Sequence, residues 1–334
     1  MSDIQLTTVI IIASGALSFL SAPLFSLILI PTAKRIGAID VPRDGRRMHQ
    51  KPVARIGGVA IFSAFLIGAA ILLFVRPSLW NKFAAAIIFG GAVIVLGGLA
   101  DDIYKLSPWQ KLFYQALAAL VAVALGVRLA EGTLGALLTV FWCALLTNAF
   151  NLIDGLDGLS SMSAAFCLFA LFSASDEEAI FYALLLCAVL GFLPLNLRPA
   201  ILFLGDAGAM LLGFSLAVAS AGAFSAEPSA ERAVAIGLVF AVPLFDTVFA
   251  ATRRILRGKS PFSPDREHLH HRLVDRGLPH GQASLLLSLL SGGFAALGVT
   301  ILSVGFSIAS LILSILLIFP TASVIMIGRT KKVR

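Results

Sequence analysis

The stretch GGVAIFSAFLIGAAILLFV (residues 57–75) carries no charged side chain. Its length matches the ~20 residues that an α-helix needs to cross the roughly 30 Å hydrocarbon layer of a bilayer. Similar runs recur along the whole chain of 334 residues, of which 59% are hydrophobic and 13% are charged, whereas soluble globular chains have about 25% charged residues. Because no linker or change in composition divides the chain, residues 1–334 are predicted to form a single all-α integral membrane domain.

We expect a polytopic bundle of about 11 transmembrane helices. Their approximate cores are residues 8–31, 57–75, 83–100, 112–127, 134–149, 158–174, 179–195, 208–224, 233–251, 282–303 and 307–328. The first run is too long for the apolar core of a signal peptide. It also lacks basic residues before it and a small-residue cleavage pattern after it, so it is predicted to stay in the chain as a span.

Basic residues are distributed unevenly between the two sides of this bundle. The odd-numbered connections and the C-terminal tail contain 21 of the 25 Lys and Arg residues. Positively charged loops stay in the cytoplasm, so the N-terminus is predicted to lie outside the cytoplasm and the C-terminus inside it. The net charge of +7 therefore reports topology and a cytoplasmic face suited to anionic membrane lipids, and it does not indicate nucleic-acid binding.

The chemically unusual segments all fall on odd connections, at residues 32–56, 101–111, 148–158, 196–207 and 252–281. We therefore expect them to face the cytoplasm together and to form one active site. The first segment, DVPRDGRRMHQKPVARIGG (residues 40–58), mixes basic residues with His49 and is typical of an ordinary juxtamembrane loop. However, Gly57 and Gly58 at the entrance of the span indicate that another group approaches the backbone closely.

Two adjacent carboxylates, Asp101 and Asp102, stand at the cytoplasmic end of an apolar helix, where charge is costly. Neighbouring helical residues point about 100° apart, so we expect one aspartate to face the bundle and the other the loop. Mutual repulsion favours a proton on one of them, which suits a general base. A plain pair of charges at a helix end is the alternative, although the helix dipole opposes it. Lys111, at the start of the next span, also opposes the dipole and suggests an anionic partner.

Amide and carboxylate side chains recur every third residue in NAFNLIDGLDGL (residues 148–159), at Asn148, Asn151, Asp154 and Asp157. A row of such oxygen ligands suits a hard cation, or a ribose and a base edge. The spacing differs from that of the EF-hand calcium loop, in which the acidic residues alternate. This segment is the strongest single indication of a functional site.

A lone carboxylate, Asp206, stands between glycines at the start of another apolar span in NLRPAILFLGDAG (residues 196–208), which Asn196 opens. An acidic residue is favourable at a helix N-terminus, so Asp206 is predicted either to cap the helix or to hold a magnesium ion that bridges to phosphate. The sequence alone leaves both interpretations open.

The last polar segment contains three of the five histidines within four residues, and it includes Asp265, Arg266, His268, His270 and His271. A zinc site would need a separated third ligand, which this pattern lacks. A basic cradle for a diphosphate is therefore favoured. Asp246 lies inside the preceding span, where a carboxylate needs an internal partner.

Together these motifs resemble the polyprenyl-phosphate N-acetylhexosamine-1-phosphate transferase family (glycosyltransferase family 4), in family order over nearly the whole chain. Asp101-Asp102 resemble its paired aspartates, residues 148–159 its NxxNxxDGxDGL segment, residues 203–208 its FxGDxG segment, and residues 261–273 its PFSPDxxHxHH loop. The last motif is most similar to that of the branch that uses UDP-GlcNAc and undecaprenyl phosphate.

The resemblance implies a Mg²⁺-dependent enzyme, with Mn²⁺ as a substitute. It would transfer GlcNAc-1-phosphate from UDP-GlcNAc to undecaprenyl phosphate and release UMP, which initiates an O-antigen, common-antigen or teichoic-acid-linkage glycan. Asp206 and Asn151 would hold the metal, while Asp101, Asp102 and Lys111 would orient or deprotonate the lipid phosphate. The other candidates would bind substrate: His49, Asn148, Asp154, Asp157, Asn196, Asp265, Arg266, His268, His270 and His271. By analogy with the family, a homodimer is expected.

A membrane transporter of an anionic nucleotide or a divalent metal is the alternative. Transporters place ionisable groups near the bilayer midplane, often in repeated halves. Here only Asp246 lies deep and the chain has no internal repeat, so the enzyme is favoured. The motifs do not decide between UDP-GlcNAc and other UDP-N-acetylhexosamines, nor between direct attack by the lipid phosphate and a covalent aspartyl-phosphate.

Overall fold

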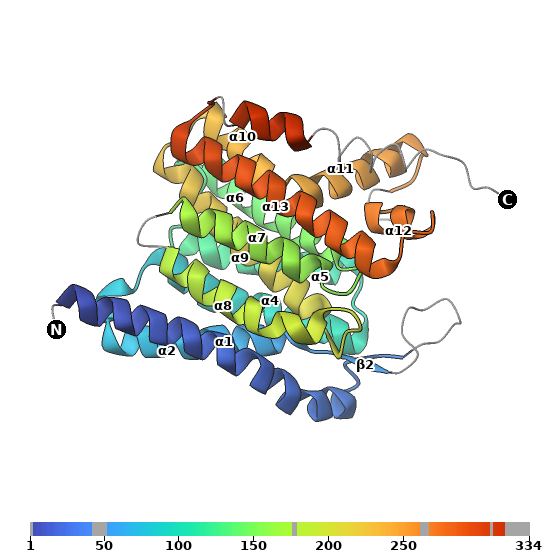
Figure 1. The fold of residues 1–334 in the computed structure, drawn as a ribbon, viewed down its shortest axis with the longest axis horizontal. Coiled ribbons are helices and arrows are strands. Elements are labelled where there is room, and N and C mark those ends of the chain that lie inside the picture. Colours follow the sequence, from blue (N-terminus) through green and yellow to red (C-terminus); the bar gives the residue numbers. More distant parts are fainter. Residues whose placement is uncertain (1–2, 42–51, 176–178, 261–266, 308–309, 318–334) are drawn as a thin grey trace.

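Long helices packed side by side form the structure, a computed structural model that describes residues 3–41, 52–175, 179–260, 267–307 and 310–317 (Figure 1). The helices are stacked from α1 and α2 at one face of the bundle to α10 and α13 at the opposite face. Their bounds are α1 (Asp3–Ile36), α2 (Gly57–Val75), α3 (Lys82–Ala85), α4 (Gly91–Tyr104), α5 (Pro108–Ala124), α6 (Gly132–Ile153), α7 (Leu159–Ser173), α8 (Ala179–Asn196), α9 (Gly205–Ala226), α10 (Ala230–Val239), α11 (Ala241–Leu256), α12 (Leu269–Val274) and α13 (His280–Val304). A 3₁₀ turn (Pro77–Leu79) follows α2, and a π-helical turn (Ala86–Gly90) joins α3 to α4.

The predicted helical membrane architecture is confirmed. Among the described residues, seven segments are long and apolar enough to cross a membrane: α1, α2, the α3–α4 segment, α6, α8, α9 and α13. Helices α10 and α11 make an eighth if they count as one span, although the chain bends by 88° between them. The apolar helices α5 and α7 are shorter, with 17 and 15 residues. The number of eleven spans and the orientation of the termini stay predictions, and most of the predicted span 307–328 lies outside the described residues.

Helix α9 is the centre of the bundle and α1 lies at its edge. Within an 18-residue apolar stretch of each helix, the buried share is 89% in α9 and 17% in α1. Small residues along α9 let neighbouring backbones approach closely. A Cβ atom on Gly213 of α9, for example, would lie 2.5 Å from the carbonyl oxygen of Leu146 in α6. The start of α9, where Asp206 lies, is therefore enclosed by other elements.

Three very short strands join the segment between α1 and α2 to the start of α9. Strand β2 (Val53–Arg55) pairs antiparallel with β1 (Ile39–Asp40) and parallel with β3 (Leu202–Phe203), in the order β1-β2-β3. Arg55 pairs in register with Phe203, three residues before Asp206. The sequence analysis predicted no strand, because two or three residues are too few for an alternating pattern to appear. The sheet nevertheless places Arg55 beside the start of α9.

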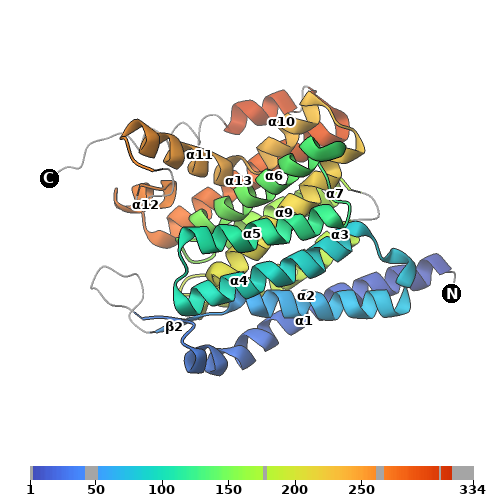
Figure 2. The ribbon, with the colours of Figure 1, turned by 180° about the vertical axis from the view of Figure 1, so that it is seen from behind.

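The predicted connections are partly helical, because the helices continue past their apolar cores. Asp101 and Asp102 lie in the last turn of α4, which ends where Lys105 adopts a left-handed conformation with φ 57°. Helix α5 then begins at a capping box formed by Ser107 and Gln110. Figure 2 shows α4 and α5 side by side, with β2 at the same end of the bundle as the turn that joins them. Polar residues expected in loops therefore stand on rigid helix ends.

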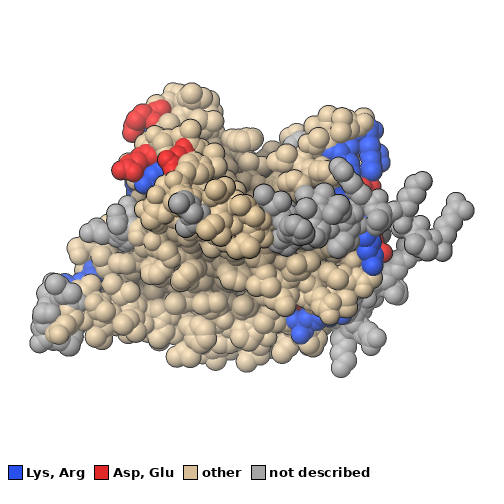
Figure 3. All heavy atoms as spheres, turned by 45° about the horizontal axis from the view of Figure 1, so that its top comes forward, with Lys and Arg blue, Asp and Glu red and all other residues tan. Residues whose placement is uncertain are grey.

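The charged surface is asymmetric. On the face shown in Figure 3, most of the Lys and Arg atoms lie at one end of the bundle, to the right, and the Asp and Glu atoms gather at the other end. The basic end is the one that carries α12 and β2 (Figure 1). This asymmetry agrees with the uneven distribution of basic residues along the sequence.

Candidate active site

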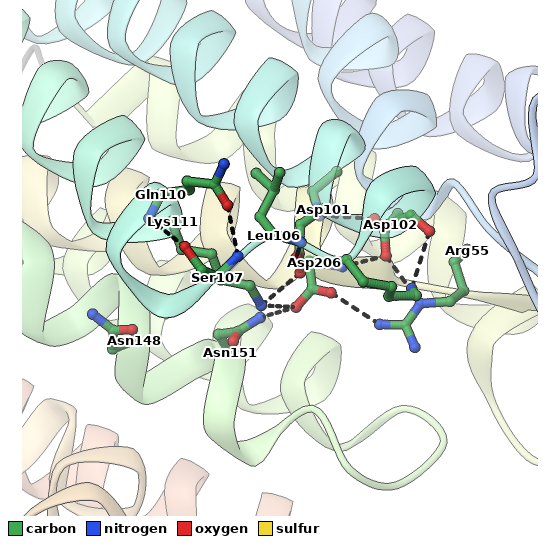
Figure 4. A network of polar contacts seen from close by, with 12 residues as sticks. Arg55, Asp101, Asp102, Leu106, Ser107, Gln110, Lys111, Asn148, Asn151 and Asp206 are labelled. Atoms are coloured by element: carbon green, nitrogen blue, oxygen red, sulfur yellow. Dashed lines mark hydrogen bonds and ion pairs between the residues drawn. The ribbon is translucent and has the colours of Figure 1, made fainter. Parts of the chain in front are cut away.

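Side chains from separate segments converge at the first turn of α9 (Figure 4). Asp206 Oδ1 accepts a hydrogen bond from Asn151 Nδ2 of α6 at 2.5 Å and pairs with Lys111 Nζ of α5 at 3.2 Å. Its Oδ2 accepts a hydrogen bond from Arg55 Nη2 of β2 at 3.1 Å. Two aspartates of α4 complete the group. We call these six residues the carboxylate cluster: Arg55, Asp101, Asp102, Lys111, Asn151 and Asp206.

Asp102 anchors the start of α9. Its side chain is fully buried, and its Oδ1 accepts hydrogen bonds from Arg55 Nε at 2.9 Å and from the backbone amide of Asp206 at 3.1 Å. Its Oδ2 accepts one from the amide of Ala207 at 3.2 Å. The first amides of a helix have no partner within the helix and carry partial positive charge, so a carboxylate from another helix is stabilised there. Asp102 therefore fixes the position of Asp206.

Asp101 faces the other way, toward the turn between α4 and α5. Its Oδ1 accepts a hydrogen bond from the amide of Leu106 at 2.7 Å, and its Oδ2 pairs with Lys111 Nζ at 2.6 Å. The prediction that the adjacent aspartates diverge is thus confirmed, since Asp102 points into the bundle. Lys111 therefore pairs with both Asp101 and Asp206.

Glycines allow α2 and α4 to touch the start of α9. A Cβ atom on Gly58 or on Gly98 would collide with the backbone of the first residues of α9. Gly205 begins α9 with φ 74°, a conformation that strains residues with a side chain, and a Cβ atom there would also lie 2.7 Å from Asp102 Oδ2. The close approach predicted from Gly57-Gly58 is therefore the approach of α2 to α9.

The charges of the cluster do not cancel. It contains three carboxylates and two cations, so one negative charge is left over when all five groups are ionised. Burial opposes the charge of Arg55, but the attraction of Asp102 and Asp206 outweighs it and raises the pKa of the guanidinium. An excess of negative charge in an enclosed site favours a further cation. The arrangement can therefore attract a further cation.

Oxygen donors for a hard cation are present in the cluster. Asp206 and Asp101 share Lys111, and Asn151 donates a hydrogen bond to Asp206 through its amide nitrogen, so Oδ1 is the atom of Asn151 that is left to bind a cation. Mg²⁺ is usually held by one or two carboxylates together with substrate phosphates and waters, instead of a complete protein cage. Within the described ranges, no three His, Cys, Asp or Glu residues are arranged to hold a metal by themselves. The residues therefore fit a Mg²⁺ ion that is bound jointly with a diphosphate.

Two residues that are predicted to bind substrate, Asn148 and Asn196, make hydrogen bonds that join neighbouring elements of the chain. Asn148 of α6 and Gln115 of α5 exchange hydrogen bonds of 2.7 and 3.3 Å. Asn196, at the end of α8, accepts a hydrogen bond from Ser161 Oγ of α7 at 2.8 Å and donates one to the carbonyl of Leu202 in β3 at 3.1 Å. Both amides are buried or half-buried and satisfied by protein groups, so their contacts support the shape of the site.

Asp154 and Asp157 lie in the turn between α6 and α7. Asp157 Oδ2 accepts a hydrogen bond from the amide of Ala200 at 3.3 Å, which ties this turn to the segment before β3. Asp154 is half-buried, and desolvation raises its pKa to about 8 against the opposing charge of Arg55. Asp154 therefore holds its proton near neutral pH in the absence of a bound cation.

A second group of polar side chains lies beside this turn. Asp246 of α11 and His268 are both buried, with 2.8 Å between Oδ2 and Nδ1, so the internal partner predicted for Asp246 is His268. The rings of His268 and His270 are stacked with centroids 5.9 Å apart, and those of His270 and His271 lie 4.2 Å apart. We call these four residues the histidine cluster. It contacts the turn after α6, because a Cβ atom on Gly155 would collide with His270 Nε2.

Burial lowers the pKa of His270 to about 3, with a further lowering by the neighbouring His271. His270 is therefore neutral at neutral pH, which restricts the charge that the predicted basic cradle supplies. The predicted substrate-binding residues His49, Asp265 and Arg266 lie outside the described residues, so their roles stay predictions.

Arg55 is the residue that the sequence analysis missed. It was counted only among the basic residues that determine topology, yet it pairs with both Asp102 and Asp206. The available signal was its position two residues before Gly57, at the entrance of a span. A cation at such a close backbone contact is placed to pair with a carboxylate on the neighbouring helix.

Comparisons with known proteins agree with these motifs. Glycosyl transferase family 4 matches residues 84–223, a region that contains most of the carboxylate cluster. The probable undecaprenyl-phosphate N-acetylglucosaminyl 1-phosphate transferase of Bacillus subtilis (strain 168) is 33% identical over 324 residues, which cover 90% of this chain and 89% of the relative.

Two further relatives carry related names. The decaprenyl-phosphate N-acetylglucosaminephosphotransferase of Mycobacterium tuberculosis (strain ATCC 25618 / H37Rv) is 33% identical over 305 residues, covering 78% of this chain and 74% of the relative. The undecaprenyl-phosphate alpha-N-acetylglucosaminyl 1-phosphate transferase of Escherichia coli (strain K12) is 30% identical over 307 residues, covering 84% and 81%. The chain therefore belongs to glycosyl transferase family 4, the polyprenyl-phosphate N-acetylhexosamine-1-phosphate transferase family that its motifs predicted.

Proposed function

We propose that this chain transfers GlcNAc-1-phosphate from UDP-GlcNAc to undecaprenyl phosphate, releases UMP, and so initiates a lipid-linked glycan of the cell envelope. The names of the relatives support this reaction. The observation that carries the proposal is the carboxylate cluster, in which acidic, amide and cationic side chains from α4, α5, α6, α9 and β2 meet. Phosphoryl transfer between two anions depends on this kind of positioning and charge neutralisation.

The reaction exchanges one phosphorus–oxygen bond for another. An oxygen of the lipid phosphate forms a bond to the sugar-bearing phosphorus of UDP-GlcNAc. The bond from that phosphorus to the bridging oxygen breaks, and the bridging oxygen leaves with the electron pair as part of UMP. Both reactants are anions, and charge develops on the transferred group and on the leaving oxygen. Lys111 and Arg55 are the cations of the cluster that would balance it.

The adjacent aspartates have different roles in this proposal. Asp102 is a positioning residue, because its oxygens are engaged by Arg55 and by the amides at the start of α9. Asp101 faces Lys111 and the loop, so it is the member of the pair that would orient the lipid phosphate or accept its proton. A direct attack by the lipid phosphate needs no covalent enzyme intermediate.

The metal proposed for this reaction is Mg²⁺, for which Mn²⁺ would substitute. Asp206 and Asn151 would hold it, and it would supply Lewis-acid polarisation of phosphoryl oxygens. Lys111 and Arg55 keep Asp206 ionised, and Asp102 holds the turn on which Asp206 stands. Each of these contacts is made by the chain itself, so the site is arranged before substrate binds.

The donor would lie between the two clusters. Asp157 would bind the uracil ring, and Asp154 the ribose or the metal, on the turn that joins α6 to α7. His268, His270 and His271, together with Asp265 and Arg266, would bind the diphosphate. Asn148 and Asn196 would act mainly by holding α5, α6 and α8, as their hydrogen bonds indicate.

The proposed setting is the bacterial inner membrane, with the N-terminus in the periplasm and the site on the cytoplasmic face. The basic end of the bundle, where both clusters lie, supports this orientation through the positive-inside rule. Membrane lipids would surround the apolar helices, the polyprenyl tail would lie among them, and a homodimer is proposed from the family analogy alone.

The experiment is a UMP-release assay on purified protein in detergent, with undecaprenyl phosphate, Mg²⁺ and a panel of UDP-N-acetylhexosamines. We expect UMP from UDP-GlcNAc that requires both the lipid and the metal. Release with another donor but not with UDP-GlcNAc would correct the sugar. A thermal unfolding measurement would show whether the purified protein is folded. Folded protein that releases no UMP with any donor would contradict the proposed enzyme and favour the transporter.

A further inference from the structure

Asp246 is a buried carboxylate that the proposed reaction leaves without a role. It is 2% exposed and lies in α11, a helix that contributes no residue to the carboxylate cluster. Both of its oxygens are engaged by one short segment: Oδ2 lies 2.8 Å from His268 Nδ1, and Oδ1 accepts a hydrogen bond from the amide of Leu269 at 2.8 Å. This two-point contact fixes the position of the segment that carries the three histidines.

The contact also decides which nitrogen of His268 carries the proton. An ionised carboxylate is only an acceptor, so Nδ1 must be the donor. The opposite edge of the ring, Nε2, is then left to act as an acceptor in the neutral ring, or as a second donor once the ring is charged. In either state the hydrogen bond from Nδ1 to Asp246 is retained.

The arrangement extends from Asp246 to the turn that carries the predicted donor-binding residues. The His268 ring is 4% exposed and lies parallel to the His270 ring, with 6° between the planes. His270 is 2% exposed, and its Nε2 is buried against Gly155 without a hydrogen-bond partner in the structure. Asp246, His268, His270 and Gly155 therefore form a continuous line of contacts from α11 to the turn after α6.

We propose that Asp246 is a positioning residue that holds His268 in the Nδ1–H form and so aims its Nε2 at the diphosphate of the bound donor. This inference rests on the proposed transferase function. A carboxylate that bonds one ring nitrogen of a histidine fixes which nitrogen carries the proton, and loss of the partner that orients a metal-ligating histidine typically costs 10–100-fold in function. Asp246 acts through His268 and does not itself touch substrate.

A purely structural role is the competing explanation, because Asp246 also receives the first amide of α12. The variant Asp246→Asn distinguishes this structural role from the proposed positioning role. Its side-chain oxygen still accepts the hydrogen bond from Leu269, but its NH₂ group then faces His268 Nδ1. That group is a donor, so it forces the proton of the ring to Nε2. The variant therefore keeps the hydrogen bond that anchors α12 but reverses the tautomer of His268. If Asp246 had only a structural role, this reversal would not lower the activity.

The experiment compares Asp246→Asn, His268→Gln and the double variant, with Glu267→Gln as a matched control. Glu267 neighbours His268 in sequence, but its carboxylate pairs with Arg253 and Arg257 instead. For Asp246→Asn we expect kcat to fall by about 10–100-fold, with KM for UDP-GlcNAc within about threefold and an unfolding temperature close to that of the wild type. The control should keep kcat within about twofold. The double variant should be no slower than the slower single variant, because both changes remove the same interaction.

Wild-type kcat in Asp246→Asn would overturn the proposal, and so would losses that multiply in the double variant. A wild-type enzyme that is inactive with every donor would instead contradict the proposed function. In that case ¹⁵N NMR of histidine-labelled protein still tests Asp246, with His268→Gln used for assignment. We expect Nδ1–H at His268 in the wild type and Nε2–H in Asp246→Asn, and the same tautomer in both proteins would overturn the proposal.

Discussion

The carboxylate cluster and the histidine cluster lie at the same end of the bundle but hold their polar groups in different ways. In the first, Asp206 pairs with Arg55 and Lys111, and the charges come from segments far apart in sequence. In the second, one buried carboxylate holds a histidine, and burial keeps the central ring, His270, neutral by lowering its pKa to about 3. The difference indicates that the first cluster supplies charge to the reaction and the second supplies orientation.

Of the variants that distinguish the two clusters, Asp206→Asn should cause the largest loss of activity. The change removes the charge that both cations of the carboxylate cluster share, while nearly preserving the shape of the side chain. We expect kcat for UMP release to fall by about 10³-fold, the upper end for loss of a preorganised charge-stabilising group. A loss no larger than that of Asp246→Asn would break the distinction between charge and orientation.

The adjacent aspartates should fail for different reasons. Asp102→Asn places an NH₂ group against Arg55 or against the amides of α9, so we expect lower thermal stability together with a loss of about 10²-fold or more in turnover. Asp101→Asn can still accept the hydrogen bond from Leu106, and it should lose turnover with little change in unfolding temperature. Paired thermal unfolding and UMP-release measurements check both variants. Equal losses of stability would contradict the assignment of Asp102 as the positioning residue.

Gly98→Ala tests whether the close contact of α4 with α9 shapes the carboxylate cluster. A Cβ atom there would collide with the backbone of Ala207, so we expect a destabilisation of about 1–3 kcal/mol and reduced activity. Gly237→Ala in α10 is the matched control, because a Cβ atom at that position meets no other atom within 4 Å. The control should be neutral or more stable by up to about 1 kcal/mol. Similar unfolding temperatures for the two variants would show that the contact is not tight.

The smallest expected effect is the acid dependence of stability that His270 introduces. Its pKa is lowered on folding from about 6.5 to about 3, so its contribution is complete above pH 6.5 and is lost as the pH falls toward 3. At pH 5 the loss is at most about 2 kcal/mol. The unfolding temperature of the wild type should therefore fall between pH 7 and pH 5 more steeply than that of His270→Gln. Parallel curves would contradict a buried neutral ring.

Much of this organisation could be predicted from the sequence, because helices and motifs are local features. The apolar runs predicted helices, and the connection expected at residues 148–158 contains the turn that follows the end of α6 at Ile153. The divergence of Asp101 and Asp102 followed from helical geometry alone. These predictions needed only the periodicity of one helix.

Long-range pairings were beyond the reach of the sequence. Arg55 and Asp206 are separated by 151 positions, and the short strand that joins them leaves no periodic signal. The sequence indicated that Asp246 needs an internal partner but did not identify it, since His268 is 22 positions away along the chain. In both cases tertiary packing decides which charges meet.

The central claim is that this chain transfers a phosphosugar, and one labelling measurement tests it most directly. UDP-GlcNAc carrying ³²P in the sugar-bearing phosphate, and a second sample labelled in the uridine-bearing phosphate, would each be incubated with enzyme, undecaprenyl phosphate and Mg²⁺. The label would then be followed into the lipid phase. We predict that the sugar-bearing phosphorus enters the lipid while the other label stays in UMP, and that Asp206→Asn abolishes the transfer. Lipid that gains GlcNAc without ³²P, with UDP as the released product, would contradict the account.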